Sequence, residues 1–260
     1  MKANSKIIFI CLMSFLSIRA DIFIESILDQ YKNYLIEGTY VGFDWSHFQV
    51  KPLSRYDTFK ISFNHFKKNN GQVVVELGTS RSFVHGGLVG CNNDDSIYWT
   101  PAHPENWDWG AGFFTRMAAE SLAHLNPIIH TIDIIPSHIE RCKIMTADFS
   151  DYITYHVASS VDFLKTCLPE SIDLLYVDTG DMTPIEPTAL LQLQEAMVIV
   201  EYNLLSAHGI ILIDDVRNQT PKQFGETSDL GKAKYSIPYF LEHGFEIIAD
   251  GYQVILKKIH

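Results

Sequence analysis

The sequence predicts an α/β protein built on a doubly wound, mostly parallel sheet. Five short apolar runs alternate with segments of helical spacing, which is typical of a parallel sheet covered by helices on both faces. Two more strand-like runs follow, with only Gly251 between them, so they must pair as an antiparallel hairpin because no crossover helix fits there. Together these runs predict a seven-stranded sheet.

The predicted elements follow one another with short connections. The strands lie at 73–77, 128–133, 153–157, 172–178, 209–214, 245–250 and 252–258. The helices lie at 111–125, 136–144, 159–167, 187–206 and 230–244. The domain that carries the sheet is therefore expected to span 71–260.

Residues 21–70 have a different pattern, which is helical and rich in aromatic residues. Asp21 and Ser54 are suitable helix N-caps because their side chains accept hydrogen bonds from the first free amides. We expect this region to form a helical cap on the sheet domain.

The first twenty residues leave three interpretations open. Two lysines precede the apolar run IIFICLMSFLSI, which is too short to span a bilayer comfortably but resembles a signal-peptide core. Cleavage after Ala20 would export the protein; an apolar helix packed on the domain, or translation from Met13, would leave it in the cytoplasm. No stable membrane span is expected.

The bulk charge excludes one class of partner. The chain holds 31 acidic and 20 basic residues, a net charge of −11, and no block of Lys or Arg. Such a chain lacks the basic surface that neutralises phosphates in general nucleic-acid binding. The oligomeric state is left open.

Acidic residues end four of the five parallel runs. The ends carry Glu76 with Gly78, then Asp133, Asp178 and the pair Asp214–Asp215. Ligands of open parallel sheets bind outside the carboxyl ends of the strands, and a buried carboxylate needs a partner, water or a ligand. The acids therefore predict a polar binding site at one edge of the sheet.

With the terminal hairpin, the ordered motifs VVVELGTSRS, IHTIDI, IDLLYVD and GIILIDD resemble the class I S-adenosylmethionine-dependent methyltransferases. The resemblance covers about residues 71–258 and is nearest to the small-molecule O-methyltransferases, including the metal-dependent catechol and caffeoyl-CoA type. It implies the Rossmann-like methyltransferase fold, S-adenosylmethionine as cofactor and a small-molecule acceptor.

The resemblance also implies roles for the strand-end residues. Gly78 would let the backbone turn beside the methionine part of the cofactor, and Asp133 would accept hydrogen bonds from the two ribose hydroxyls. Further cofactor contacts are expected from Glu76, Thr79, Ser80, Ser159, Ser160 and Asp178.

One segment departs from this pattern. Gly78 and Asp133 lie 55 positions apart (133 − 78), whereas nucleotide folds place the ribose acid about 20 residues after the glycines. The excess lies in a loop at about 84–110 that is rich in Gly, Pro, Asn and Trp. Either Trp99, Trp107 and Trp109 roof the site, or the loop packs as a simple insertion.

Two questions of chemistry stay open. Asp178, Asp214 and Asp215 match the Asp, Asp and Asn that bind magnesium in the catechol-type enzymes, so they either hold Mg²⁺ or a similar cation or only cap turns and bind cofactor. The lysine base of that family is replaced by Asp181, which leaves Asp178, Asp181 and His85 as candidate catalytic residues.

Two rival functions are weighed against methyl transfer. A nucleotide-binding Rossmann oxidoreductase is disfavoured by the terminal hairpin and by the lack of a G-x-G-x-x-G fingerprint. An exported or catalytically silent binding protein of the same fold is favoured by the signal-like first twenty residues, because S-adenosylmethionine is a cytosolic metabolite.

Overall fold

The computed structural model describes residues 23–33, 35–36, 53–79, 113–181, 184–216 and 230–259. The segment 1–20 and the loop 84–110 with its tryptophans and His85 lie outside these ranges, as does Ser80. Within the described residues, no helix combines the length and the apolar character that a membrane crossing needs. The described ranges include every strand end at which the sequence predicts ligand-binding acids.

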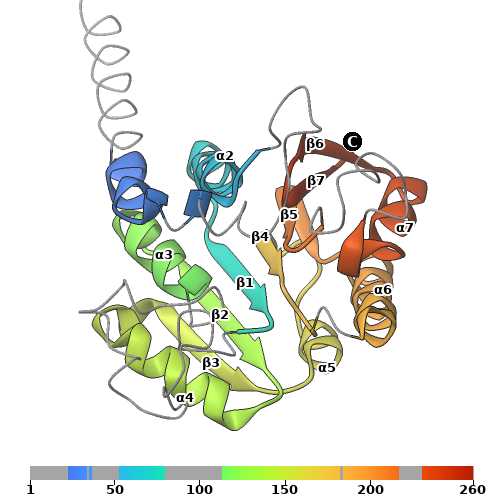
Figure 1. The fold of residues 1–260 in the computed structure, drawn as a ribbon, viewed down its shortest axis with the longest axis horizontal. Coiled ribbons are helices and arrows are strands. Elements are labelled where there is room, and N and C mark those ends of the chain that lie inside the picture. The colour runs from blue at the N-terminus through green and yellow to red at the C-terminus, as the bar shows by residue number, and fades with distance from the viewer. Residues whose placement is uncertain are drawn as a thin grey trace, which may run out of the picture.

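A seven-stranded sheet forms the centre of the described structure (Figure 1). Its strands are β1 Val73–Leu77, β2 Ile128–Asp133, β3 Ile153–Val157, β4 Ile172–Val177, β5 Leu205–Ile213, β6 Phe245–Asp250 and β7 Val254–Lys258. They lie in the order β3-β2-β1-β4-β5-β7-β6. The neighbours among β1 to β5 pair in parallel, and β7 runs antiparallel to both β5 and β6.

The predicted fold class and the terminal hairpin are thus confirmed, and the main difference concerns one strand. β5 begins at Leu205 and not at Gly209, because Leu205 already pairs with Ile172 across a register shift. The residues 206–208 at the start of this strand are less apolar and partly exposed, so the apolar run in the sequence begins only at Gly209.

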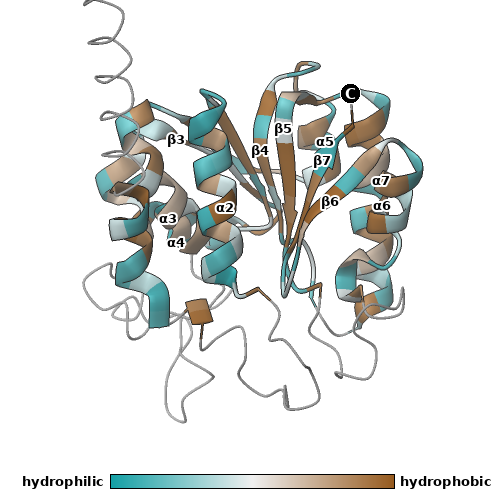
Figure 2. Cartoon of the chain, turned by 90° about the horizontal axis from the view of Figure 1, so that it is seen from above, coloured by the Kyte–Doolittle hydropathy of each residue, from teal (hydrophilic) through white to brown (hydrophobic). Residues whose placement is uncertain are grey.

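Helices cover both faces of the sheet (Figure 2). On one face lie α2 Arg55–Lys68, α3 Phe113–Leu122, α4 Pro136–Met145 and the helical residues 23–33 and 35–36. On the other face lie α5 Ser160–Leu164, α6 Ile185–Glu201 and α7 Ser236–Glu242. The sheet therefore separates two hydrophobic cores.

Strand β1 shows how the sheet feeds both cores. Val74 belongs to the core beneath α2 and α3, whereas Val75 and Leu77 belong to the core beneath α5, α6 and α7. Successive side chains of a strand point to opposite faces, so Glu76 faces the same layer as Val74. The acid that ends the apolar run is thereby directed toward α3.

Helix α2, from the predicted cap region, packs directly on the sheet. Phe59, Phe63 and Phe66 recur at helical spacing and are almost completely buried in the core on that face. Ser54 caps the helix: it accepts a hydrogen bond from the amide of Asp57, whose carboxylate in turn accepts one from the Ser54 amide. This cap fixes the direction of the first turn, which begins with Arg55.

Removal of this cap should destabilise the protein without changing its core. We expect Ser54→Ala to lower the free energy of unfolding by about 1 kcal/mol, because the side-chain acceptor of the first turn is lost. Urea denaturation measures the change. Ser150→Ala is the control, because Ser150 is exposed; equal stability of the two variants would contradict the role of the cap.

Candidate functional site

The carboxyl ends of β1 and β4 meet at Gly78. Gly78 has a φ of 84°, a left-handed conformation that side chains rarely adopt. A Cβ at this position would lie 2.5 Å from the carbonyl oxygen of Asp178. The Gly78 amide also donates a hydrogen bond to the carbonyl of Ile132, at 2.9 Å. Gly78 is therefore required by the close approach of two neighbouring strand ends, independently of any ligand.

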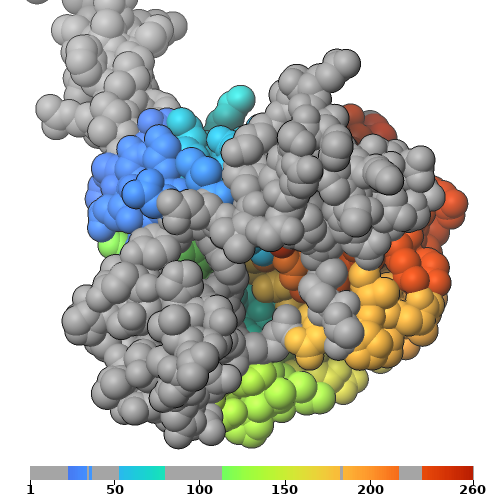
Figure 3. Space-filling model, in the orientation of Figure 1, coloured from blue at the N-terminus to red at the C-terminus, as the bar shows by residue number. Residues whose placement is uncertain are grey.

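An open cleft of about 230 Å³ begins at Gly78 and extends over the ends of β2, β3 and β4. Figure 3 shows a hollow on this face, with atoms from the end of β1, coloured teal, at its bottom. The residues that line the cleft include Asp133, Ile134, His138, Ser159 and Gly180. Ile134 is 69% exposed, so the cleft offers an uncovered apolar side chain next to a carboxylate.

Asp133 is held in place at the end of β2. Its Oδ1 accepts a hydrogen bond from the amide of Ile135 at 2.8 Å, and His138 Nδ1 lies 3.2 Å from its Oδ2. A carboxylate oxygen has two lone pairs, so these contacts orient the group and still leave acceptor capacity for a ligand in the cleft.

Both predicted serines line the cleft, but they also have structural roles. Ser159 is the N-cap of α5. The Ser160 hydroxyl donates to Glu195 of α6, and the Thr179 hydroxyl donates to the other oxygen of the same carboxylate at 3.0 Å. Burial raises the pKa of Glu195 to about 7, although both hydroxyls oppose this. Glu195 thus ties the ends of β3 and β4 together behind the cleft.

Glu76 is buried on the other side of Gly78. Its carboxylate accepts hydrogen bonds from Thr115 of α3 and from Thr131 of β2, the latter at 2.6 Å. Burial raises the pKa of Glu76 to about 7, against the effect of these two hydrogen bonds. The strand-end acid is thus satisfied within the protein.

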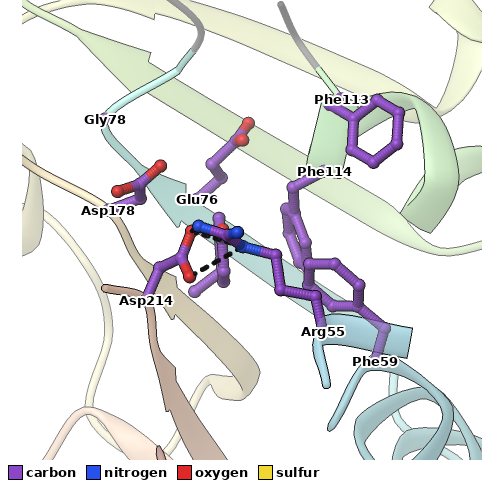
Figure 4. A pocket seen from close by; sticks show the side chains of 9 residues that line it. Arg55, Phe59, Glu76, Gly78, Phe113, Phe114, Asp178 and Asp214 are labelled. Carbon is purple, nitrogen blue, oxygen red and sulfur yellow. Dashed lines mark hydrogen bonds and ion pairs between the residues drawn. The ribbon is translucent and has the colours of Figure 1, made fainter. Parts of the chain in front are cut away.

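A second, smaller cavity lies on this side (Figure 4). Its walls are aromatic on one side and charged on the other. The lining residues are Arg55, Phe59, Glu76, Gly78, Phe113, Phe114, Tyr176, Asp178 and Asp214. The rings of Phe114 and Tyr176 stack with their centroids 4.0 Å apart. Gly78 lines both cavities, so they adjoin at the β1 turn.

The three acids predicted as metal ligands come together here. Carboxylate oxygens of Asp178, Asp214 and Asp215 lie within 4.8 Å of one another, and we call these residues the acid triad. Asp215 adopts a left-handed φ of 54°, which turns its side chain back toward the other two. The acids are partly or fully buried. The grouping follows from the adjacency of β4 and β5.

Arg55 pairs with two members of the acid triad. Its Nε lies 3.0 Å from Asp214 Oδ1, and its Nη2 lies 3.1 Å from Asp214 Oδ2 and 3.0 Å from Asp215 Oδ1. The dashed lines in Figure 4 mark the contact of this guanidinium with Asp214. The guanidinium also lies over the ring of Tyr252, 4.2 Å from its centroid. The first turn of α2 is thereby fixed to the end of β5.

Lys232 pairs with the third member of the acid triad. It lies in a short 3-10 turn, Gly231–Ala233, and its side chain is fully buried. Its Nζ is 2.6 Å from Asp178 Oδ1 and 2.9 Å from Asp215 Oδ2. Burial opposes its charge, but the three carboxylates hold the pKa of Lys232 above its usual range. Lys232 is therefore an ammonium ion and not a base.

The two cations act unequally on the acids. Burial disfavours the ionised form of Asp215, but Lys232 and Arg55 outweigh it and hold the pKa of Asp215 below its usual range. Burial raises the pKa of Asp178 to about 6, although Lys232 acts in the opposite direction. Asp178 thus binds a proton more readily than Asp215.

The remaining predicted catalytic residue with described coordinates, Asp181, lies elsewhere. Asp181 is exposed and lines the larger cleft, and it is not a member of the acid triad. Thr79 is buried directly after Gly78. Ser80 and His85 lie outside the described residues, so their roles stay predictions.

Sequence reasoning missed Arg55, Lys232 and Glu195. A cation in the first turn of a helix is unfavourable to the helix dipole, so Arg55 directly after the cap was a signal that a specific partner exists. Gln192 and Glu195 lie three positions apart on a buried face of α6, which was a second signal. No local sequence pattern around Lys232 predicted that its side chain pairs with the strand-end acids.

Sequence comparisons identify no relative of the chain. No protein-family model matches it, and no curated protein sequence matches it.

Solved structures share the fold at low identity. The methyltransferase PaMTH1 from Podospora anserina, solved with S-adenosylhomocysteine, has a TM-score of 0.51 at 14% identity and covers 100% of this chain and 98% of that one. The chain has the fold of S-adenosylmethionine-dependent methyltransferases. A Corynebacterium glutamicum protein has a TM-score of 0.50 at 12% identity, covering 92% of this chain and 90% of that one. A Geobacter sulfurreducens methyltransferase has a TM-score of 0.45 at 12% identity, with 77% of each chain covered.

The buried carboxyl of Glu195 should make stability depend on pH. Between pH 4.5 and about 7 the unfolded chain releases the Glu195 proton while the folded chain keeps it. The free energy of unfolding should therefore fall as the pH rises through this range, by up to about 1.4 kcal/mol per pH unit from this group, and level off above it.

Glu195→Gln should remove this contribution, because an amide does not titrate in this range. We expect a shallower decline and a variant that is more stable than the wild type at mildly alkaline pH, as measured by urea denaturation across the range. Glu201→Gln, at the exposed end of α6, is the control. Identical pH profiles for Glu195→Gln and the wild type would show that Glu195 is ionised in the folded protein.

Proposed function

We propose that this chain binds S-adenosylmethionine and transfers its methyl group to an oxygen atom of a small acceptor molecule. The observation that carries the proposal is the position of Gly78 between two cavities of different character. One is an open cleft with a carboxylate and serines, and the other has aromatic and charged walls. A methyltransferase needs adjoining places for its donor and its acceptor.

The larger cleft suits the donor. In this proposal Asp133 binds the ribose hydroxyls, with its orientation fixed by the Ile135 amide. The exposed side chain of Ile134 covers one face of the adenine, and the β3 turn with Ser159 and Ser160 borders it. The methionine part passes the Gly78–Thr79 turn, where the lack of a Cβ at Gly78 lets the ends of β1 and β4 approach each other at the floor of the cleft.

We assign the smaller cavity to the reacting group of the acceptor; its free volume is about 10 Å³, so its aromatic side chains must move apart to admit an acceptor ring. Phe59, Phe113 and Phe114 give it apolar walls, which favour a planar or apolar group. Asp178 borders the same cavity and adjoins Gly78. We assign Asp178 the role of the general base, in preference to Asp181, because Asp181 lines only the donor cleft.

The reaction is an in-line displacement. S-adenosylmethionine supplies a methyl group on a sulfonium, which makes the methyl carbon electrophilic. The acceptor oxygen forms a bond to that carbon while the sulfur–methyl bond breaks, and the sulfonium becomes a neutral thioether. The acceptor proton passes to the Asp178 carboxylate. The protein contributes mainly position, because holding donor and acceptor in line removes much of the entropic cost of the reaction.

Calorimetric titration with S-adenosylmethionine and S-adenosylhomocysteine tests the donor site. We expect the wild type to bind both and Asp133→Ala to bind at least about tenfold more weakly, because a hydrogen bond to a charged group contributes roughly 1.5–3 kcal/mol. Asp151→Ala is the matched control, because Asp151 is exposed and does not line the cleft.

The outcomes separate the proposal from its rivals. A wild type that binds neither ligand would remove the proposed function. Binding without release of S-adenosylhomocysteine, in the presence of a panel of phenols and other hydroxyl compounds, would favour a catalytically silent binding protein of the same fold.

A further inference from the structure

We propose that Lys232 and Arg55 take the place of a divalent metal ion at the acid triad, so that the chain needs no metal. This inference deepens the proposed function, on which it rests for its consequence for the acceptor. Its basis, however, is the set of contacts among the described residues, which are independent of any donor.

The oxygens of the acid triad already have partners. Asp214 Oδ1 accepts from Arg55 Nε and Gln253 Nε2, and Asp214 Oδ2 accepts from Arg55 Nη2 and the hydroxyl of Tyr176. Asp214 therefore has two donors on each of its oxygens. A hard cation such as Mg²⁺ binds through these same lone pairs.

Asp215 also has donors on both oxygens, two on Oδ1 and one on Oδ2. Its Oδ1 accepts from Arg55 Nη2 at 3.0 Å and from the hydroxyl of Tyr252 at 2.9 Å, and its Oδ2 accepts from Lys232 Nζ. Among the described residues, the second oxygen of Asp178 is the one carboxylate oxygen of the acid triad for which no donor is found. A single free oxygen cannot anchor a divalent ion.

The position of a shared metal is also filled. Mg²⁺ sits about 2.1 Å from each ligand oxygen. An ion bound jointly by Asp178 Oδ1 and Asp215 Oδ2 would lie between the two oxygens that Lys232 Nζ contacts at 2.6 Å and 2.9 Å. The ammonium occupies that space and would repel the ion at a distance of only a few ångströms.

Two cations neutralise most of the charge of the acid triad. The three carboxylates carry −3, and the guanidinium and ammonium carry +2, which leaves −1. The Lys232 ammonium has three N–H donors, and three acceptors surround it: Asp178, Asp215 and, at 3.5 Å, the carbonyl of Gly180. The acid triad thus does not fit a divalent ion as it stands.

The absence of a metal has a consequence for the acceptor. A metal in such a site binds an acceptor best through two adjacent oxygens, because they chelate the ion. Without the ion a second oxygen gains nothing from chelation. We therefore assign this chain an acceptor with a single nucleophilic hydroxyl on an apolar or aromatic frame, such as a simple phenol, in preference to a chelating diol.

The experiment is a titration of the metal-free protein, dialysed against EDTA, with Mn²⁺ alone. Binding is followed by calorimetry and by the electron paramagnetic resonance signal of free Mn²⁺. We expect the wild type to show no saturable binding at millimolar Mn²⁺. Thermal unfolding of the wild type should be unchanged by EDTA. Saturable binding by the wild type that Asp214→Asn abolishes would overturn the inference.

Removal of the ammonium should create the metal site. We expect Lys232→Ala to lose about 10 °C in Tm without metal, because two buried carboxylates lose their partner, and to regain part of it with Mn²⁺. It should bind Mn²⁺ at least about tenfold more tightly than the wild type, whereas Lys232→Arg should not. Lys234→Ala is the matched control, because Lys234 pairs with Glu186 away from the acid triad.

The two proposals fail separately. Saturable Mn²⁺ binding by a wild type that still binds S-adenosylhomocysteine overturns the inference alone. A wild type that binds neither Mn²⁺ nor S-adenosylhomocysteine overturns the proposed function but supports the metal-free acid triad. If Lys232→Ala does not fold, the titration of the wild type with Mn²⁺ still decides whether the acid triad binds a metal.

Discussion

The ion pair between Arg55 and Asp214 is the interaction on which the rest of the site depends. It joins the first turn of α2 to the end of β5, between residues 159 positions apart in the chain, and both side chains are buried. Removal of one partner of such a pair costs about 3–5 kcal/mol, because the other charge stays buried without compensation. The same guanidinium reaches Asp215 and lies over Tyr252, so a single side chain aligns α2, β5 and the hairpin turn. Phe59, one turn later on α2, is thereby placed in the wall of the smaller cavity.

Most groups that face the two cavities are fixed by the protein itself before any ligand arrives. Asp133 is oriented by the Ile135 amide, and Ser160 and Thr179 share the carboxyl of Glu195. Glu76 is likewise satisfied by two threonines. Such preorganisation means that little side-chain freedom remains to be lost when a ligand binds, which favours affinity and accurate placement of reacting atoms.

The sequence predicted the fold better than the site, for a physical reason. The alternation of apolar runs with helical segments and the hairpin around Gly251 are local patterns, and they determine strand type and direction. The strand-end acids could be assigned to one edge because parallel strands end together, and the structure brings Asp178, Asp214 and Asp215 within reach of one another. The charges that neutralise them could not be found this way. Arg55 and Lys232 approach from a helix before the sheet and from a turn after β5, and no local period encodes such pairings.

The order in which the chain is synthesised gives the Arg55 contact another meaning. Arg55 leaves the ribosome long before Asp214, and Gln253 and Tyr252, which complete the same cluster, come later still. Until then the first turn of α2 lacks the ion pair that fixes it to β5, although Phe59, Phe63 and Phe66 can already pack on the strands made earlier. Contacts across such long sequence separations form late and slow the folding of a domain. The cluster around Asp214, which borders the smaller cavity, is therefore complete only after the last hairpin of the chain has been made.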